Sequence, residues 1–519
     1  MSILTRLFLG AYSGLWSAAG PALRRHKRLK PDFDQRLAPD GWLSGMCPED
    51  AACESCADTS PSGQASGAAR PLTLWVQAAS GGEAWLAHSL VPAIADALDQ
   101  HPELSARPLT LLCTTWTRQG MDILEKIQPP HCRAAAVLVL PRYFPLDRPA
   151  LMRRAMGLAR PDAVILLETE LWPGLMAAAT EQDVPVLALN ARMTEKSFKA
   201  YSKIGFFWRK HAPERILAVS QDDAGRFARL FGRPERVAVM PNIKFDRLVP
   251  AEPPSSLQES APSLQEAHSL RGFRAEAGIS GQALLAVLAS VREEEEDLLL
   301  PVVKSLQGFS ISGNPAAVAV APRHMHRVEA WKTKLQAAGI PYSLRSAHGE
   351  SGRAEPVAPF CSHPPVYLWD TFGELHSLYS IADAVYVGGS LVPLGGQNFL
   401  EPLALGVIPF VGPHIDNFLW VGKELFDQGL AVMLPDATAL LAAFESELSL
   451  RRDAFVSGGH DAGPDWRAGR SREAGKVMDR FASWLRPRLG GSGQAAEALA
   501  RVLAKEGKQR KQRFPKEIP

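Results

Sequence analysis

Residues 384–402, AVYVGGSLVPLGGQNFLEP, lead from an apolar strand into two glycine pairs, then an amide and a carboxylate. The apolar start is typical of a buried parallel strand, and the glycines let backbone approach a ligand with no Cβ in the way. Asn398 and Glu401 lie three residues apart, so they share one face if a helix begins near Gln397, where free N–H groups favour an anion. An ordinary strand, turn and helix connection has the same pattern. We interpret the stretch as a nucleotide cradle because so many of these signals fall within one loop.

Short apolar runs alternate with helical stretches on both sides of residues 249–270, a segment rich in Pro, Ser and Glu. Before it come LTLWVQAAS, LTLLCTT, AAVLVL, AVILLE, VPVLALN, RILAVS and VAVM, and after it LLAVLAS, AAVAVAP, VYLW, AVYVGG and VIPFVG. This alternation indicates parallel strands in α/β sheets. The sequence therefore predicts two α/β halves around a linker, with a cleft where the strand C-termini face one another.

The composition is that of a globular protein, with 46% hydrophobic and 22% charged residues among 519. The net charge of +2 says little about partners, but basic residues cluster at 24–30 and 508–516. Such clusters suit an anionic membrane or nucleic acid, although a solvated tail explains the second one equally well. Six cysteines do not indicate a disulfide scaffold. Cys47, Cys53 and Cys56 lack a fourth ligand at zinc spacing, so reduced thiols and no metal are expected.

The N-terminus carries a run of 17 uncharged residues, LFLGAYSGLWSAAGPAL, followed by RRHKRLK. This is the shortest length that crosses a bilayer core of about 30 Å, and its glycines and proline weaken it as a helix. A tilted span and an interfacial helix both fit, and a cleaved signal peptide is the competing interpretation. The basic flank places the following domain in the cytoplasm.

Three candidate catalytic positions occur in the first half. Glu83 stands on a Gly-supported turn after LTLWVQA, where a helix N-terminus would keep it ionised as a general base, although a first-turn capping role fits as well. Glu168 and Glu170 follow AVILL, and we favour Glu168 for the cleft while Glu170 pairs with an Arg such as Arg192. Lys244, just before the linker, could neutralise a leaving phosphate or a carboxylate charge.

The second half offers candidate nucleotide contacts. Arg323 follows Pro322 at the end of AAVAVA and presents a planar fork suited to phosphate. His324 and His326 lack a partner at metal spacing, so we interpret them as polar loop residues. The segment TFGEL, residues 371–375, fits a second nucleotide-contacting turn or a capping box that starts a helix at its threonine.

Taken together, these residues resemble the Kdo transferases of lipopolysaccharide synthesis, which pass 3-deoxy-D-manno-octulosonic acid (Kdo) from CMP-Kdo to lipid A precursors. The resemblance covers nearly the whole chain. It rests on WVQAASGGE, YFPLDRP, ARPDAVILLETELWPGL, VPVLALNARMTEKS, AVSQDDAGRF, GRPERVAVMPNIKFD, VAPRHMHR, DTFGEL, YSIADAVYVGGSLVPLGGQNFLEP and VGPHIDNF.

The resemblance implies a GT-B fold with two Rossmann-like domains, an N-terminal membrane anchor, and an inverting, metal-independent mechanism without cofactors. Glu83 would deprotonate the acceptor hydroxyl, and Glu168 and Lys244 would stabilise the transition state. CMP contacts would come from the following positions: Pro322, Arg323, Phe372, Gly373, Glu374, Asn398, Phe399, Leu400 and Glu401.

The chain also departs from the family pattern. The usual Val of the base motif is Gly81, the usual His before Asn398 is Gln397, and the usual Gly-Ser-Thr-His run reads Ala-Ser-Val-Arg at 289–292. The last change puts acceptor or donor contacts there in doubt. Insertions at 46–70, 249–270 and 345–364 have no assigned function.

The expected organisation is as follows: 1–45, a membrane-associated segment; 46–70, a flexible insertion; 71–248, the acceptor domain; 249–270, a linker; and 271–519, the CMP-Kdo domain with a basic tail. The expected protein is a glycosyltransferase on the cytoplasmic face of the inner membrane, with CMP-Kdo, a lipid A precursor and the lipid surface as partners and no nucleic acid. Two alternatives stay open: another GT-B nucleotide-sugar enzyme, and a catalytically silent lipid-binding or scaffold protein of the same fold.

Overall fold

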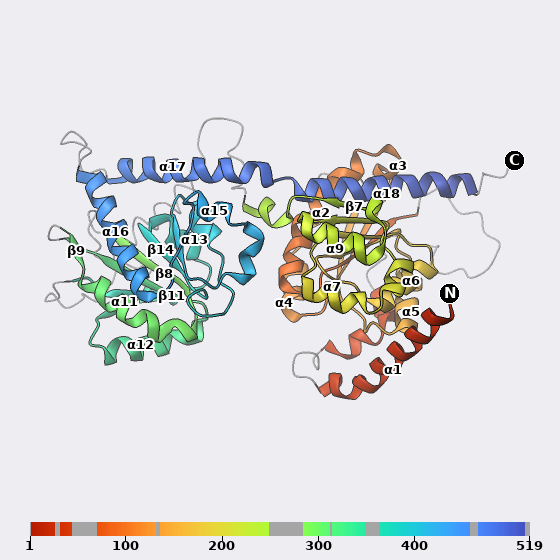
Figure 1. Ribbon diagram of the computed structural model, residues 1–519, viewed down its shortest axis with the longest axis horizontal. Helices are drawn as coiled ribbons and strands as arrows, with labels where there is room; N and C mark the ends of the chain where they lie inside the picture. Colours follow the sequence, from red (N-terminus) through yellow and green to blue (C-terminus); the bar gives the residue numbers. More distant parts are fainter. Residues whose placement is uncertain are drawn as a thin grey trace. The chain divides into compact units, whose positions relative to one another are not determined.

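The computed structural model describes residues 2–25, 32–43, 70–130, 135–248, 284–311, 314–347, 363–456 and 466–513. It divides into unit 1, Met1–Arg247 with Arg488–Pro519, and unit 2, Leu248–Pro487 (Figure 1). The predicted linker and nearly all of the predicted insertions at 46–70 and 345–364 lie outside the described residues, as do Cys47, Cys53 and Cys56.

Unit 1 is built on a seven-stranded parallel sheet of order β3-β2-β1-β4-β5-β6-β7. Its strands are β1 (Leu72–Gln77), β2 (Leu109–Thr115), β3 (Val137–Tyr143), β4 (Ala163–Leu167), β5 (Val186–Ala191), β6 (Arg215–Ala218) and β7 (Val237–Val239). All seven apolar runs of the first half are therefore strands, as predicted. The chain moves outward from β1 to β3 and returns to β4 on the other side of β1. This reversal beside β1 is where doubly wound sheets place their ligands.

Helices cover both faces of this sheet. They are α1 (Ile3–Arg25), α2 (Gly81–Asp99), α3 (Pro102–Ser105), α4 (Arg118–Leu124), α5 (Pro149–Ala159), α6 (Pro173–Glu181), α7 (Glu195–Ser202), α8 (Gly205–Lys210), α9 (Gln221–Phe231) and α18 (Gly491–Arg513). Short 3-10 turns are η2 (Asp34–Arg36), η3 (Pro39–Leu43), η5 (Pro234–Arg236) and η6 (Ile243–Leu248). Alternate residues of β1 enter different cores: Leu74 and Val76 pack with α2 and α18, and Trp75 packs with α5, α6 and α8.

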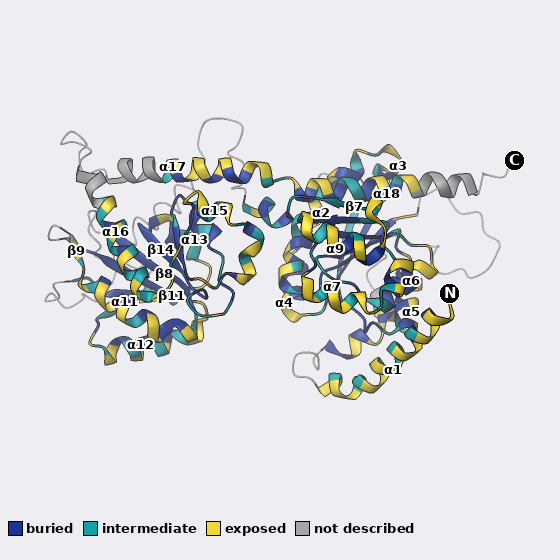
Figure 2. Ribbon diagram, in the orientation of Figure 1, coloured by how far each residue is buried: buried dark blue, intermediate teal, exposed yellow. Residues whose placement is uncertain are grey.

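Unit 2 has a second seven-stranded parallel sheet, of order β12-β13-β11-β8-β14-β15-β16. The strands are β8 (Leu285–Val291), β11 (Ala317–Pro322), β12 (Tyr342–Leu344), β13 (Val366–Leu368), β14 (Ala384–Val387), β15 (Pro409–Val411) and β16 (Val432–Met433), and β9 (Ser310–Ile311) pairs with β10 (Asn314–Pro315) apart from the sheet. The chain direction reverses here beside β8, whose two neighbours are β11 and β14. Figure 2 shows the central strands of both units as buried.

The helices of unit 2 are α11 (Glu296–Gly308), α12 (Val328–Ala337), α13 (Leu375–Ile381), α14 (Leu400–Ala404), α15 (Glu424–Asp427), α16 (Ala437–Val456) and α17 (Trp466–Leu485). The 3-10 turns are η7 (Glu293–Glu295), η8 (Met325–Arg327), η9 (Arg345–Ala347), η10 (Asp416–Val421) and η11 (Arg486–Arg488). Two parallel α/β units of the kind that GT-B enzymes contain are thus present, as predicted.

The C-terminal boundary differs from the predicted domain of residues 271–519, because α18 belongs to unit 1. Leu499 and Leu503 of α18 enter the same core as α2. Asp246 accepts hydrogen bonds from the first amides of the helix, Gly490 N at 2.8 Å and Ser492 N at 2.6 Å. The chain therefore leaves unit 1, builds unit 2 and returns.

The N-terminal helix α1 lies against unit 1 (Figure 1). Leu9 is buried in the core that contains α6 and α8, and the Phe8 ring lies 4.9 Å from the Phe207 ring. Within the described part of the chain, no helix is long and apolar enough to cross a bilayer. Of the alternatives that the sequence left open, the spanning helix is therefore not supported, because glycines, a proline and hydroxyl residues dilute the apolar run.

Candidate active site

Glu83 lies in the first turn of α2, directly after β1. Its carboxylate accepts a hydrogen bond from the Ser80 amide at 3.0 Å, and its own amide donates to Ser80 Oγ at 3.4 Å, which forms a capping box. Burial, followed by the charge of Glu168, raises the pKa of Glu83 to about 7. The sequence predicted that the helix N-terminus would keep it ionised. That prediction is wrong near neutrality, because desolvation and a like charge outweigh the capping bonds.

Glu168 follows β4 and forms an ion pair with Lys244, whose Nζ lies 2.6 Å from Glu168 Oε1. Glu168 has φ of 56°, a left-handed conformation that costs a non-glycine residue free energy and often marks a functional site. The turn η6 holds Lys244 in place, since Asn190 Oδ1 accepts from Ile243 N at 2.9 Å. Both charged side chains are about four-fifths buried, with 18% and 23% exposed, so their attraction is weakly screened by solvent.

Glu170 has a partner that the sequence did not indicate. Trp172 Nε1 donates to Glu170 Oε2 at 2.5 Å, in place of the suggested pairing with Arg192. Burial and then the charge of Glu83 raise the pKa of Glu170 to about 8, while hydrogen bonds from Trp172 and Gln77 oppose the rise. Glu170 is therefore largely protonated at neutral pH.

The three residues predicted to be catalytic, Glu83, Glu168 and Lys244, are all in unit 1, at the C-terminal ends of the neighbouring strands β1 and β4 and in η6. The Glu168 carboxylate is paired with the Lys244 ammonium, and Glu83 has a pKa of about 7. That combination can remove a proton from a hydroxyl group and stabilise charge beside it.

Two of the predicted nucleotide contacts, Arg323 and Glu401, carry charges that both shift the pKa of Tyr379 in unit 2. Burial and the charge of Glu401 raise the pKa of Tyr379, and Arg323 opposes the rise together with a hydrogen bond to Ser290. Pro322 ends β11 and is buried, while Arg323 is exposed and its amide donates to Val291 O at 2.8 Å. Tyr379 was not found from the sequence, because it lies on α13 without a motif.

The turn at 371–375 presents one aromatic ring to solvent. Phe372 is 87% exposed, and Gly373 has φ of 90°, which favours glycine. Glu374 accepts from Thr371 Oγ1 at 2.7 Å and pairs with Arg345 at 3.0 Å. The helix begins after these residues, at Leu375, so the alternative of a helix starting at Thr371 is wrong.

Helix α14 begins at Leu400, three residues later than the predicted start. Asn398 and Glu401 still meet, because Asn398 Nδ2 donates to Glu401 Oε1 at 2.8 Å. The side chains of Phe399 and Leu400 are fully buried, and the Phe399 ring lies 5.2 Å from the Phe418 ring. The burial covers the whole of each residue, so neither the side chains nor the backbone of these two residues are open to solvent.

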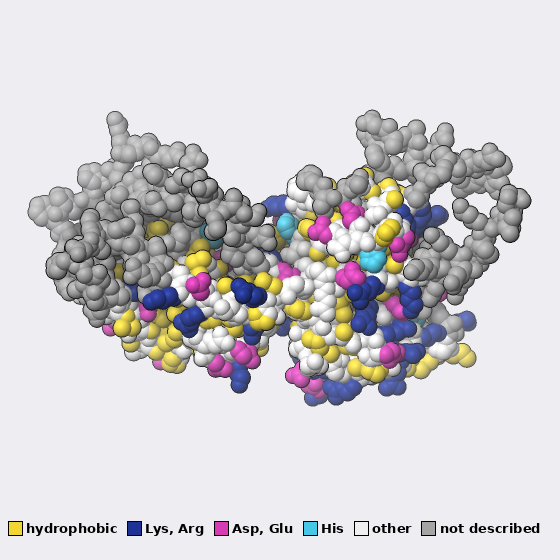
Figure 3. All heavy atoms as spheres, turned by 90° about the horizontal axis from the view of Figure 1, so that it is seen from above, with side chains coloured by type: hydrophobic (Ala, Val, Ile, Leu, Met, Phe, Trp, Pro, Cys, Tyr) yellow, Lys and Arg dark blue, Asp and Glu magenta, His cyan; other side chains and the backbone are white. Residues whose placement is uncertain are grey.

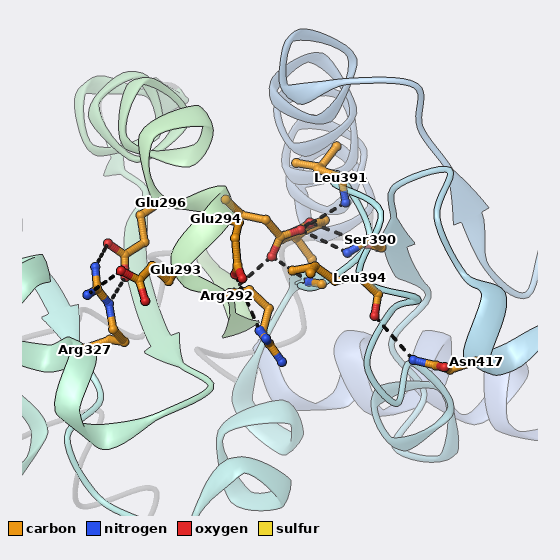
Figure 4. Close-up of polar contacts among 12 residues, drawn as sticks. Arg292, Glu293, Glu294, Glu296, Arg327, Ser390, Leu391, Leu394 and Asn417 are labelled. Carbon is orange, nitrogen blue, oxygen red and sulfur yellow. Dashed lines mark hydrogen bonds and ion pairs between the residues drawn. The ribbon is translucent and has the colours of Figure 1, made fainter.

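The glycine-rich turn after β14 already holds an anion of the protein itself. Glu295, fully buried, accepts from Gly389 N at 2.6 Å, from Ser390 N and Leu391 N at 3.0 Å, and from Tyr386 OH at 2.6 Å. Figure 4 labels Ser390 and Leu391, and dashed lines mark the hydrogen bonds that their amides donate.

The interpretation of this stretch as a nucleotide cradle is therefore wrong for these three amides, which already donate to Glu295. Gly388 instead lets the turn pack closely against the backbone of β8, since a Cβ on Gly388 would lie 2.6 Å from Ser290 O. Beside the turn, Arg327 forms ion pairs with Glu293 at 3.0 Å and Glu296 at 2.7 Å (Figure 4). No group of three metal-ligating side chains occurs among the described residues.

The comparisons with known proteins place these features in a class and a family. The model of the 3-deoxy-D-manno-octulosonic-acid transferase (kdotransferase) family matches residues 54–247. The 3-deoxy-D-manno-octulosonic acid transferase of Bordetella pertussis is 31% identical over 418 residues, which cover 79% of this chain and 87% of that one. The Haemophilus influenzae transferase of the same name is 28% identical, covering 73% and 80%.

The fold, the carboxylate and lysine cluster and these relatives define the chain as a glycosyltransferase. Within that class, it belongs to the Kdo transferase family. Among solved structures, the C-terminal CMP-Kdo binding domain of WaaA from Acinetobacter baumannii is similar at 23% identity and a TM-score of 0.31, covering 42% of this chain and all of that domain.

Proposed function

We propose that this protein transfers Kdo from CMP-Kdo to a lipid A precursor, with inversion at the anomeric carbon and release of CMP. The observation that carries the proposal is the cluster of charged side chains in unit 1. Glu83 has a pKa of about 7, and it lies close enough to the Glu168–Lys244 pair for the charge of Glu168 to raise that pKa. A general base is most effective when its pKa lies near the working pH.

In the proposed reaction, Glu83 takes the proton of the acceptor hydroxyl as its oxygen attacks the anomeric carbon of Kdo. The new carbon–oxygen bond forms while the bond from that carbon to the CMP phosphate oxygen breaks, and CMP leaves with the electron pair. Lys244 supplies positive charge next to Glu168, where it stabilises negative charge on the reacting groups.

We assign donor binding to unit 2. Arg323 offers an exposed guanidinium at the end of β11, and its charge and that of Glu401 both reach Tyr379. Phe372 offers an exposed ring on which a base or sugar could stack. Glu374, Asn398 and Glu401 supply polar groups, while Phe399 and Leu400, between the last two in sequence, are fully buried.

The outer face of α1 supports a lipid acceptor. Ile3, Leu4, Leu7 and Leu15 are between 54% and 78% exposed, an unusual number of apolar side chains on one helix of a water-facing surface. Basic residues end the helix at Arg24 and Arg25. Apolar residues with a basic flank suit a helix lying in the surface of an anionic membrane.

Figure 3 shows Lys and Arg side chains gathered most densely on the unit 1 part of the visible face, with acidic side chains among them. We therefore propose that unit 1 meets the cytoplasmic face of the inner membrane.

The test uses the full-length protein, CMP-Kdo and one defined tetra-acylated lipid A precursor dispersed in detergent. The expected result is release of CMP with a matching gain of Kdo mass on the lipid, and loss of about 10²- to 10⁴-fold in kcat for Glu83→Gln. CMP release without any lipid would indicate another nucleotide-sugar enzyme. CMP binding without turnover would indicate a silent lipid-binding or scaffold protein, and either result refutes the proposal.

A further inference from the structure

The inner face of α1 is directed at the loop 168–172, which carries Glu168 and Glu170. Beyond Phe8 and Leu9, two further residues of the helix, Tyr12 and Trp16, make contacts that lead into residues 168–172. Both are half-buried, so they belong to the packed side of the helix.

The first contact runs through Asp147. Tyr12 OH donates to Asp147 Oδ2 at 2.9 Å. The same carboxylate accepts from Gly174 N at 2.7 Å and from Leu175 N at 2.8 Å, the first amides of α6. Asp147 has no exposed surface, and a Cβ on Gly174 would lie 2.5 Å from Asp147 O, so the fit is tight. Helix α6 begins directly after the loop, and this contact therefore fixes the C-terminal end of the loop.

The second contact is a row of stacked indole rings. Trp16 stacks on Trp116 with ring centroids 6.4 Å apart, and Trp116 stacks on Trp172 at 5.4 Å. Trp172 then donates its indole N–H to Glu170 at 2.5 Å. Phe144 closes the row, 6.0 Å from Trp116 and 5.5 Å from Trp172. Trp172, which donates to Glu170, is thus linked through Trp116 to Trp16 of α1.

We propose that α1 is a positioning element of the active site, in which Tyr12 and Trp16 hold the loop 168–172, and with it Glu168 and Glu170, in working geometry. A small misplacement of a catalytic group costs rate even when the change lies far from the chemistry. This role is separate from any contact of the outer face with lipid. The inference rests on the proposed function, because Kdo transfer is the reaction whose rate is measured.

The electrostatics of the cluster predict where the rate effect appears. Glu83 is faced by Ser80, by Glu168 with its partner Lys244, and by Glu170. If Trp172 shifts, Glu170 loses a donor that stabilises its charged form and keeps its proton to higher pH. Glu170 is already largely protonated where Glu83 titrates, so the acid limb set by Glu83 should stay in place while kcat falls.

The experiment compares Trp16→Ala, Trp16→Phe and Tyr12→Phe in the full-length protein, with Ser17→Ala as the control on the exposed side of the helix. For Trp16→Ala we expect kcat to fall about tenfold, while the KM for CMP-Kdo stays within about twofold and the acid limb of the rate profile stays in place. Trp16→Phe should restore most of the rate, because a ring remains to stack. Ser17→Ala should behave like the wild type.

A second measurement does not depend on turnover. Hydrogen exchange followed by mass spectrometry should show faster exchange in the peptide containing Gly174 and Leu175 for Tyr12→Phe, and unchanged exchange in α2. Wild-type rates and wild-type exchange in both Trp16→Ala and Tyr12→Phe would overturn the inference. An inactive wild type would refute the proposed function alone, because the exchange result would still decide the role of α1.

Discussion

The pKa of Glu83 predicts an unusual pH dependence for the transfer reaction. An unperturbed glutamate, at 4.5, would be fully ionised above pH 6, whereas Glu83 titrates at about 7. The ionised base then makes up roughly one tenth of the enzyme at pH 6, one half at pH 7 and nine tenths at pH 8. We therefore expect kcat/KM to rise about tenfold per pH unit below 6.5 and to level off above 8.

The assay is initial CMP release between pH 5.5 and 8.5 at constant ionic strength, with CMP binding measured in parallel to separate donor affinity from chemistry. Glu83→Gln should leave a residual rate that lacks this acid limb. Glu168→Gln should move the limb to lower pH, because it removes the negative charge that helps to raise the pKa. A wild-type profile that stays flat down to pH 5.5 would refute the assignment of Glu83 as the base.

Three further substitutions test other parts of the site. Glu295→Ala leaves several buried N–H groups without an acceptor, and each such group lowers the free energy of unfolding by about 1–3 kcal/mol. Calorimetry should therefore show unfolding of unit 2 at a clearly lower temperature. The control Glu293→Ala, on the exposed side of the same turn, should change that temperature little. Lys244→Met leaves Glu168 unpaired, and the acid limb should move to higher pH as kcat falls; an unmoved limb would contradict the ion pair. Arg323→Ala should weaken CMP binding about tenfold or more by titration calorimetry, and an unchanged Kd would remove it from the donor site.

The strands could be predicted because each strand of a parallel sheet is buried on both faces and reads as an apolar run. This held for β1 to β7 and for β8, β11, β13, β14 and β15 of unit 2. It failed for β12 and β16, the two edge strands of the unit 2 sheet, whose residues are half-buried or exposed. The place of α18 could not be predicted either, since a helix at the end of the chain can pack on either unit.

The site was predictable where a motif follows a strand, as for Glu83, Glu168 and Lys244. It was not predictable where a contact joins residues far apart in sequence. Glu295 lies 94 residues from the Gly389 amide that it accepts from, so the glycine turn looked free to bind a ligand. The protonation of Glu170 likewise depends on burial and on Glu83, neither of which periodicity reveals.

The return of the chain from unit 2 to unit 1 has a consequence for biosynthesis. Leu499 and Leu503 complete the core around α2, yet the ribosome makes them only after all of Leu248–Pro487. Until then, α2 lacks part of its apolar cover, and exposed surface of this kind favours aggregation. Unit 2 can therefore fold before α18 is available to complete the core of unit 1. A chain truncated at Pro487 would carry a complete unit 2 together with a unit 1 that lacks α18.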